Sequence, residues 1–328
     1  APGLVNAVLR RLCREKGALP AIPDRNEAAY LSIRYSHPKW LVKRLLALLG
    51  REGTEAFLRA GNGQPPTAVQ INTCRFTAEQ TAETLLEEGV RAEPHPWLPD
   101  CLLLSGTGNL ERLKAFQIGA FYVQDPAARL AVLAADIRPG SRVLDVCAAP
   151  GGKSFAAAMA MGDRGEIVSC DLHENKLKRI RESAVRLGVS SIQTEAADGR
   201  QCRPEWRNRF DAVLVDAPCS GLGILGKKPE IRGKKADSLF ALPVLQNAIL
   251  DNAAGYVRPG GTLLYSTCTI LPEENEGVTD AFMGLHPEFS KESFTLPGPI
   301  GRTDGQAALW PHLHGTDGFY ICRMTRRV

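Results

Sequence analysis

Two cysteines lie where a thiol could take part in a reaction. Cys219 closely follows the β-branched run 212–216, and Cys268 follows the run 262–266. If both runs are neighbouring parallel strands, their carboxyl ends meet at the edge of the sheet where ligands of such sheets bind. A thiolate at that edge can serve as a nucleophile. The placement therefore favours a chemical role for this pair of cysteines.

One methyl transfer in particular needs a thiolate. Carbon 5 of a cytosine is a poor nucleophile, but addition of a thiolate to carbon 6 makes it an enamine-like carbon that can attack a sulfonium methyl group. A free thiol has a pKa of about 8.5, so the site must lower that pKa or supply a base. Asp216 could hydrogen-bond the exocyclic amine or the N3 proton of the adduct, which would favour cytosine over uracil. The residues alone do not decide which cysteine attacks.

The other cysteines are expected to be small buried hydrophobes, as free cysteine commonly is. They are Cys13, Cys74, Cys101, Cys147, Cys170, Cys202 and Cys322. The total of nine is odd, and no CxxC or His-rich spacing is present. The spacing therefore indicates neither a disulfide framework nor a zinc site, and no metal is expected.

A glycine-rich turn at residues 147–153 joins a predicted strand to a predicted helix. Its end, Gly-Lys followed by Ser, resembles a P-loop, and Val-Leu-Val-Asp at 213–216 could pass for the metal-binding acidic strand of a P-loop ATPase. The first glycine of a P-loop, however, is replaced by Cys147, and Pro150 removes one N–H that would help to cradle phosphate. An ATPase is an alternative that these departures disfavour.

The other interpretation of the turn is a nucleoside cofactor without a polyphosphate, approached closely by the backbone at Gly151 and Gly152. Asp171 ends the second predicted strand, where a carboxylate can accept hydrogen bonds from both ribose hydroxyls. Asp198 follows the third strand, where it can accept one from an adenine amino group. Either acid could instead only cap a helix. Because this turn lacks the dinucleotide fingerprint Gly-x-Gly-x-x-Gly, S-adenosylmethionine fits these residues best.

These residues require an α/β sheet to position them. From residue 123 onward, short β-branched runs alternate with helical periodicity, which predicts a doubly wound, mainly parallel sheet. The expected strands are 142–146, 166–170, 192–195, 212–216, 262–266 and 319–324, and the expected helices are 153–161, 174–187, 238–257 and 273–284.

Before residue 123 the pattern predicts two smaller units. Residues 36–122 read as a small α+β unit, with a strand at 68–72 and a helix at 78–87, and residues 1–35 read as helical. The chain starts with Ala1-Pro2-Gly3 and no methionine, and its first helical pattern has no beginning. We therefore expect that an upstream part is missing.

The composition is that of a globular protein. The 328 residues are 44% hydrophobic, and the length predicts about two domains. No apolar run approaches the ~20 residues that span a bilayer, and no signal peptide is recognisable, so a cytoplasmic protein without membrane contact is expected. The net charge of +4 demands no polyanionic partner. Five cations nevertheless cluster at 226–235, as solvated surface or as phosphate contacts: Lys227, Lys228, Arg232, Lys234 and Lys235.

An ordered set of motifs resembles the RNA cytosine-C5 methyltransferase family. The motifs are Leu-Asp-Val-Cys-Ala-Ala-Pro-Gly-Gly-Lys at 144–153, Asp-Ala-Pro-Cys-Ser-Gly at 216–221 and Ser-Thr-Cys at 266–268, with Phe-Tyr-Val-Gln-Asp at 121–125 and Leu-Pro-Glu-Glu-Asn at 271–275. The resemblance covers essentially the whole chain. It is greatest to the bacterial Fmu/RsmB-type group that acts on 16S ribosomal RNA, because residues 5–10 resemble the last helix of that group's NusB-like domain.

The resemblance implies an S-adenosylmethionine-dependent enzyme that methylates carbon 5 of a cytosine in RNA, with 16S rRNA as substrate. It implies that Cys268 is the nucleophile, that Cys219 resolves the adduct and releases the RNA, and that Asp216 contacts the base near the methyl donor. A monomer is expected. The implied cofactor site comprises Cys147, Ala148, Ala149, Pro150, Gly151, Gly152, Lys153, Asp171, Asp198 and Asp216.

The implied fold is a Rossmann-like class I methyltransferase sheet at 123–328. It is preceded by an accessory α+β RNA-binding domain at 36–122 and by a remnant of a helical NusB-like domain at 1–35. Two departures from the family stand out: Pro126-Ala127-Ala128 replaces the common serine or glutamate after Gln-Asp, and Gln70 replaces an arginine, which could weaken an RNA contact. A non-enzymatic RNA-binding assembly factor that keeps only the fold is the other alternative.

Overall fold

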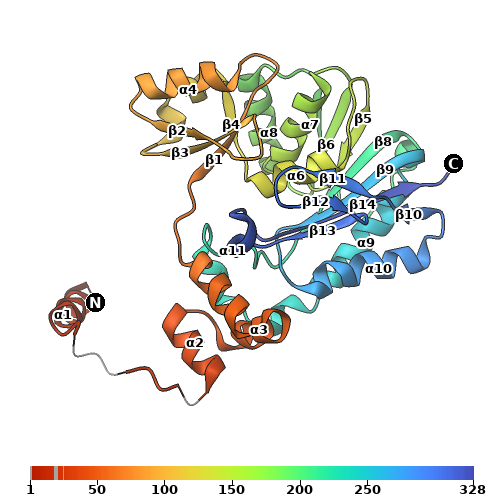
Figure 1. Ribbon diagram of the computed structural model, residues 1–328. Helices are drawn as coiled ribbons and strands as arrows, with labels where there is room; N and C mark the ends of the chain where they lie inside the picture. The colour runs from red at the N-terminus through yellow and green to blue at the C-terminus, as the bar shows by residue number, and fades with distance from the viewer. Residues whose placement is uncertain (1, 18–20, 25) are drawn as a thin grey trace. The chain divides into compact units, whose positions relative to one another are not determined.

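The computed structural model describes residues 2–17, 21–24 and 26–328. The chain divides into two compact units, residues 1–62 and 63–328 (Figure 1). Five positions of the predicted helical segment 1–35, namely 1, 18–20 and 25, lie outside the described residues. Within the described part of the chain, no helix is long and apolar enough to cross a membrane.

The first unit is helical. It contains α1 (Pro2–Arg14), α2 (Glu27–Tyr35) and α3 (Lys39–Gly61). The Asn26 side chain caps α2 by accepting a hydrogen bond from the Ala29 N–H, whereas α3 is kinked at Gly50, which adopts a φ of 65°. None of the residues of α1 is buried, although its apolar positions follow a helical period. Its origin in a NusB-like domain stays a prediction.

The second unit begins with a small antiparallel sheet in the order β2-β3-β1-β4. Its elements are β1 (Thr67–Ile71), α4 (Ala78–Glu87), β2 (Arg91–Pro94), β3 (Cys101–Ser105), α5 (Lys114–Gln117) and β4 (Phe121–Val123). Helix α4 starts with a capping box in which Thr77 and Gln80 satisfy each other's backbone N–H groups. The predicted strand and helix of this region are confirmed.

The larger sheet has the strand order β10-β14-β9-β8-β5-β6-β7, and β13 pairs with β14. Its parallel part consists of β5 (Arg142–Asp145), β6 (Glu166–Asp171), β7 (Ile192–Ala196), β8 (Phe210–Asp216) and β9 (Val257–Thr267). Strands β5, β6 and β7 progress one way from the centre and β8 and β9 progress the other way. The topological switch point therefore lies between β5 and β8, where ligands of open α/β sheets bind.

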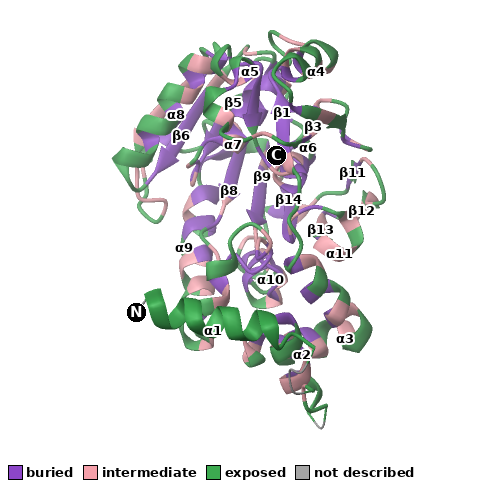
Figure 2. Cartoon of the chain, turned by 90° about the vertical axis from the view of Figure 1, so that its left-hand side faces the viewer, coloured by how far each residue is buried: buried purple, intermediate pink, exposed green. Residues whose placement is uncertain are grey.

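Helices cover both faces of the larger sheet (Figure 1). Helices α6 (Pro126–Ala134), α7 (Gly152–Met161) and α8 (Glu174–Leu187) share one apolar core with Val143 and Leu214, whereas α9 (Leu242–Ala254) and α10 (Glu276–Leu285) share the other with Leu144 and Val213. The alternation of neighbouring strand residues between two cores is that of a sheet buried on both faces. Figure 2 shows the central strands β5, β6, β8 and β9 as largely buried. The predicted doubly wound sheet is confirmed.

The structure differs from the predicted elements at α6, a helix that was not expected, and in three further places. The helix expected at 238–257 begins only at Leu242, because residues 236–239 form a 3-10 turn and Pro243 lies in its first turn. The helix expected at 273–284 begins at Glu276, after a second 3-10 turn that starts at Pro272. The strand expected at 319–324 is β14 (Phe319–Arg326), and it pairs with β9 in the antiparallel direction, not in parallel. Antiparallel strands β10 (Phe289–Lys291) and β13 (Gln306–Leu309) flank β14, and neither was predicted. The other short elements that were not predicted are β11 (Phe294–Leu296), β12 (Gly301–Thr303) and α11 (Pro311–His314).

A buried asparagine joins the two sheets of the second unit. The Asn72 side-chain amide follows β1 and donates hydrogen bonds to the carbonyls of Gly119 (2.9 Å) and Leu187 (2.7 Å). Arg186, at the end of α8, donates to the Phe116 carbonyl at 2.6 Å and lies over the Phe116 ring at 3.7 Å. These contacts explain why both sheets belong to a single compact unit.

Asn72→Ala is expected to lower the free energy of unfolding by about 1–3 kcal/mol, because two buried carbonyls lose their donor. Urea denaturation measures the loss. The control is Asn247→Ala, whose amide donates to the Pro243 carbonyl of its own helix at 2.8 Å. An equal effect of the two substitutions would contradict the proposed connection between the sheets.

Candidate active site

The glycine-rich turn connects β5 to α7 at the switch point. The Ala148 N–H donates to the Cys170 carbonyl at 2.7 Å, which fastens the turn to β6. Gly151 has a φ of 110°, and a Cβ at this position would lie 2.7 Å from the Phe155 ring. Glycine is therefore required there both by conformation and by space.

Lys153 places its charge inside the site rather than in solvent. The residue is buried at the start of α7, and its Nζ lies 2.7 Å from Asp216 Oδ2 and 4.9 Å from the centre of the Phe319 ring. Asp216 Oδ1 accepts a hydrogen bond from the Ser266 hydroxyl at 2.9 Å. Both carboxylate oxygens of Asp216 are thus oriented by partners on α7 and β9.

Asp145, which the sequence reasoning did not single out, is fully buried at the end of β5. Its Oδ2 accepts a hydrogen bond from the Ser154 hydroxyl at 2.7 Å, while its Oδ1 has no partner among the described residues. Burial raises the pKa of Asp145 to about 7. A buried carboxylate with a free oxygen can receive a cationic group of a ligand. The signal in the sequence was its position at a strand end.

The two acids expected to hold a nucleoside have different surroundings. Asp171, at the end of β6, is largely buried, and its Oδ1 accepts from the His173 N–H at 3.0 Å and lies 3.3 Å from Lys176 Nζ. Asp198 is bound by the Arg200 guanidinium through both oxygens, which lowers the pKa of Asp198 to about 2. Asp198 is therefore engaged by a neighbouring cation.

The two strand-end cysteines meet. Cys219 Sγ and Cys268 Sγ are 3.2 Å apart, and both residues are half-buried. The contact with Cys268, followed by burial, raises the pKa of Cys219 well above its ordinary value. Cys219 therefore keeps its proton at neutral pH and can donate it toward the Cys268 sulfur.

A buried carboxylate holds the two cysteine loops together. Glu274 is 1% exposed, and its Oε2 accepts from the Ser220 N–H (2.8 Å) and the Gln246 side-chain amide (2.9 Å). Its Oε1 lies within hydrogen-bond distance of the Thr269 hydroxyl at 3.3 Å. Ser220 and Thr269 are also joined directly through their hydroxyls at 2.6 Å. The Leu-Pro-Glu-Glu-Asn motif thus positions both thiols.

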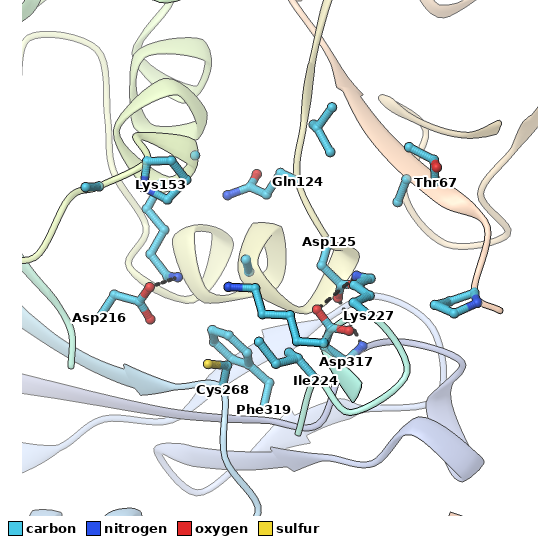
Figure 3. A pocket seen from close by; sticks show the side chains of 18 of the residues that line it. Thr67, Gln124, Asp125, Lys153, Asp216, Ile224, Lys227, Cys268, Asp317 and Phe319 are labelled. Atoms are coloured by element: carbon cyan, nitrogen blue, oxygen red, sulfur yellow. Dashed lines mark hydrogen bonds and ion pairs between the residues drawn. The ribbon is translucent and has the colours of Figure 1, made fainter. Parts of the chain in front are cut away.

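Two cavities meet at the cysteines. One, of about 510 Å³, is called here the Gln124 cavity after a residue in its wall (Figure 3). The other, of about 530 Å³, is called the Asp171 cavity and is also lined by Cys219. Residues that line both cavities are Cys147, Ala149, Asp216, Ile224, Lys228 and Cys268. A group in one cavity can therefore react with a group in the other beside Cys268.

The structure brings most of the predicted site residues together. The Gln124 cavity includes Cys147, Ala148, Ala149, Pro150, Gly152, Lys153, Asp216 and Cys268, and the Asp171 cavity adds Asp171 and Cys219. Asp198 instead lines a third cavity of about 350 Å³, together with Cys202. No group of His, Cys, Asp or Glu side chains suited to a metal ion occurs among the described residues.

Lys227 is bound to two carboxylates (Figure 3). Its Nζ lies 2.9 Å from Asp317 Oδ2 and also pairs with Asp125, whose Oδ1 caps α6 through the Ala127 N–H at 2.8 Å. Burial alone lowers the pKa of Lys227, but Asp125 and Asp317 outweigh it and raise that pKa. The expected phosphate contact of Lys227 is therefore corrected: its charge is used inside the protein. Lys234 similarly donates to the Ser220 carbonyl at 2.7 Å.

Two further expectations are corrected. Gln70 is buried, and its amide donates to the Gln124 carbonyl at 3.2 Å and to Cys101 Sγ at 3.3 Å, so it supports the accessory sheet from within and is not placed to touch RNA. Of the cysteines expected in the core, Cys13, Cys74 and Cys202 are exposed, because they lie on the uncovered α1 and in loops, and Cys147 is half-buried beside the cavities. The remaining three, Cys101, Cys170 and Cys322, are buried as expected.

Comparison with known proteins finds relatives over nearly the whole chain. Residues 132–325 match the family described as 16S rRNA methyltransferase RsmB/F, and residues 37–111 match an RsmF/B-like ferredoxin-like domain. The chain is 37% identical over 332 residues to the probable ribosomal RNA small subunit methyltransferase B of Bacillus subtilis, covering 98% of this chain and 73% of that protein. It is 34% identical to ribosomal RNA small subunit methyltransferase B of Klebsiella pneumoniae, covering 99% and 73%.

Solved structures share the fold. The crystal structure of PH0851 superposes with a TM-score of 0.86 at 35% identity, covering 93% of this chain and 69% of that one. NSun6 from Pyrococcus horikoshii, crystallised with SFG, superposes with a TM-score of 0.77 at 23% identity, covering 88% and 98%. The accessory α+β domain is thus ferredoxin-like, and the larger sheet is that of class I methyltransferases, as predicted.

Lys227→Met is expected to lower the melting temperature by about 3 °C or more, because it leaves the carboxylates of Asp125 and Asp317 close together without a cation. Adding Asp317→Asn is expected to restore part of the loss. Scanning calorimetry measures both changes, with Lys228→Met as the control on the neighbouring lysine. A loss no larger than that of Lys228→Met would refute the internal role of Lys227.

Proposed function

The chain belongs to the RsmB/F family of 16S rRNA methyltransferases, and we propose that it methylates carbon 5 of a cytosine in 16S rRNA through a transient bond between Cys268 and carbon 6. The family acts with S-adenosylmethionine, as the sequence motifs implied. The observation that carries the covalent step is the position of Cys268, 3.2 Å from a second thiol and in the wall shared by two cavities.

Residues of the Asp171 cavity, together with the turn and Asp145 in the wall of the Gln124 cavity, fit the methyl donor. S-adenosylmethionine supplies an electrophilic methyl group on a sulfonium centre. The backbone of residues 147–152 lies against the cofactor in this proposal, and the Asp171 carboxylate accepts hydrogen bonds from the ribose hydroxyls. Asp198 receives the adenine amino group when Arg200 releases it. The unpartnered Oδ1 of Asp145 fits the ammonium group of the donor, since a cation would favour the ionised form of that buried carboxylate.

The two cysteines act in different steps: Cys268 forms the bond to the base, and Cys219 assists its release. The Cys268 thiolate adds to carbon 6, which turns carbon 5 into the nucleophile that accepts the methyl group. Transfer of the carbon-5 proton to water then lets the electrons of that C–H bond restore the 5,6 double bond and expel the Cys268 thiolate, which frees the RNA. Cys219 is placed beside Cys268 to assist this release. The 3.2 Å contact between the two sulfurs supports this division, because it places the Cys219 thiol within reach of the Cys268 sulfur that must leave carbon 6.

Asp216 and Lys153 act on the base and on each other. Asp216 contacts the amino group or the protonated N3 of the adduct, so it favours cytosine over uracil. Lys153 and the Ser266 hydroxyl fix the direction of this carboxylate. Lys228, which lines both cavities, is the cation of the basic segment best placed to meet an RNA phosphate.

Substitution of the two cysteines tests the covalent step. Cys268→Ala is expected to abolish both methylation and the denaturation-resistant adduct with a 16S rRNA transcript that contains 5-fluorocytidine. Cys219→Ala is expected to lose turnover but to accumulate a stable protein–RNA species on the ordinary transcript. Denaturing gel electrophoresis with radiolabelled RNA detects both species. If the phenotypes were exchanged, the two roles would be reversed, and absence of an adduct with the wild type would favour a non-enzymatic assembly factor.

Substitution of Asp171 tests the cofactor site. Asp171→Asn is expected to weaken binding of S-adenosylmethionine tenfold or more, because hydrogen bonds to a charged acceptor contribute about 1.5–3 kcal/mol. Isothermal titration calorimetry measures the dissociation constant, and the exposed Asp237→Asn serves as the matched control. Unchanged affinity would place the ribose elsewhere, and a thermal shift with ATP but not with S-adenosylmethionine would revive the ATPase alternative.

A further inference from the structure

The side chain of Gln124 is buried without using its hydrogen-bonding groups. The residue is 6% exposed, and neither Oε1 nor Nε2 has a partner among the described residues. By contrast, the amides of the buried glutamines Gln70 and Gln246 each donate two hydrogen bonds within the protein. A buried amide without partners is costly to fold, so its retention beside a reactive site indicates a ligand that supplies the partners.

The fold fixes Gln124 in place. Its N–H donates to the Ala68 carbonyl at 3.3 Å, and its carbonyl accepts from the Gln70 amide at 3.2 Å. A Cβ added at Gly152 would lie 3.2 Å from Gln124 Nε2, so the glycine at the start of α7 leaves the room that the amide occupies. Figure 3 shows the Gln124 side chain directed toward the space beside Lys153. The accessory sheet therefore delivers this amide into the active site.

Only one of the two cavities contains Gln124. The Asp171 cavity holds the carboxylate suited to a ribose and is the place of the nucleoside part of the methyl donor in the proposed function. Gln124 lines the other cavity, which shares Asp216 and Cys268 with the first. The Gln124 cavity also contains Asp145, which meets the amino-acid end of the donor in the proposed function. Asp216 and Cys268, the two groups that act on the base, line it too, so we place the RNA base there, beside the methyl group.

The chemistry of an amide matches that of a pyrimidine. A glutamine side chain presents an acceptor and two donors in one plane, and the Watson–Crick edge of a pyrimidine presents donors and acceptors in one plane as well. Enzymes that act on an extruded base read this edge through such hydrogen bonds. We propose that Gln124 hydrogen-bonds the Watson–Crick edge of the target pyrimidine and so holds the ring against Cys268. This inference rests on the proposed function.

Gln124→Met tests the proposal, because methionine keeps the length of the side chain and removes its hydrogen bonds. We expect kcat/KM for an in vitro 16S rRNA transcript to fall about tenfold or more, with adduct formation on the 5-fluorocytidine transcript slowed in parallel. The dissociation constant of S-adenosylmethionine stays within about twofold of the wild type. The melting temperature stays the same or rises, since the lost amide had no partner.

Two matched variants calibrate these measurements. Gln70→Met removes an amide that is bonded inside the protein, so it is expected to lower the melting temperature. Gln193→Met, on the exposed edge strand β7, is expected to change none of the four readouts. The combination of lost activity with retained stability is what separates a base contact from a structural residue.

Each remaining outcome overturns the inference in a recognisable way. Full activity of Gln124→Met shows that the amide contacts nothing essential. Weaker cofactor binding with an unchanged KM for RNA assigns the amide to the methyl donor, and loss of melting temperature together with activity assigns it a structural role. A wild-type protein that forms no adduct overturns the proposed function itself, whereas an adduct equal in wild type and variant overturns only the role of Gln124.

Discussion

The parallel pairing of β8 with β9 is the constraint on which the active site depends. Its register places Asp216 opposite Ser266, so that the loops that follow carry Cys219 and Cys268 to within 3.2 Å of each other. Glu274 connects the two loops by accepting hydrogen bonds from the Ser220 N–H and the Thr269 hydroxyl. A carboxylate that is 1% exposed is costly to bury unless donors satisfy its oxygens, so these contacts also fix the direction of both loops.

The accessory sheet completes the site rather than merely adjoining it. Asn72 and Arg186 bind it to the end of α8. Gln70 lies in β1 and donates to the carbonyl of Gln124, which directly follows β4 and lies beside the start of α7. Asp125, the next residue, both starts α6 and binds Lys227. One short segment thus links the ferredoxin-like domain, the cofactor turn and the loop after Cys219.

The sequence was sufficient to predict elements that depend on local pattern. The strand ends that carry Cys219, Cys268 and Asp171 follow from β-branched runs and from the rule that ligands bind at the carboxyl ends of parallel strands. Contacts between segments distant in the chain could not be foreseen. The sequence suggests that Lys227 is a surface cation, but in the folded protein it contacts Asp317, which lies 90 residues away in the chain. From the sequence, Gln70 was expected to weaken an RNA contact, but β1 places it inside the accessory sheet. The short strands near the C-terminus contain too few residues to show the alternation of apolar and polar residues that predicts a strand.

The attachment point of the trapped adduct shows which of the two thiols bonds to carbon 6. The two cysteines lie on separate tryptic peptides, residues 210–227 for Cys219 and residues 236–291 for Cys268. After reaction with a 5-fluorocytidine-containing 16S rRNA transcript, nuclease and trypsin digestion followed by mass spectrometry locates the modified nucleotide. We expect a methylated fluorocytidine nucleotide on Cys268 in the peptide 236–291. The same mass on the peptide 210–227 would contradict it.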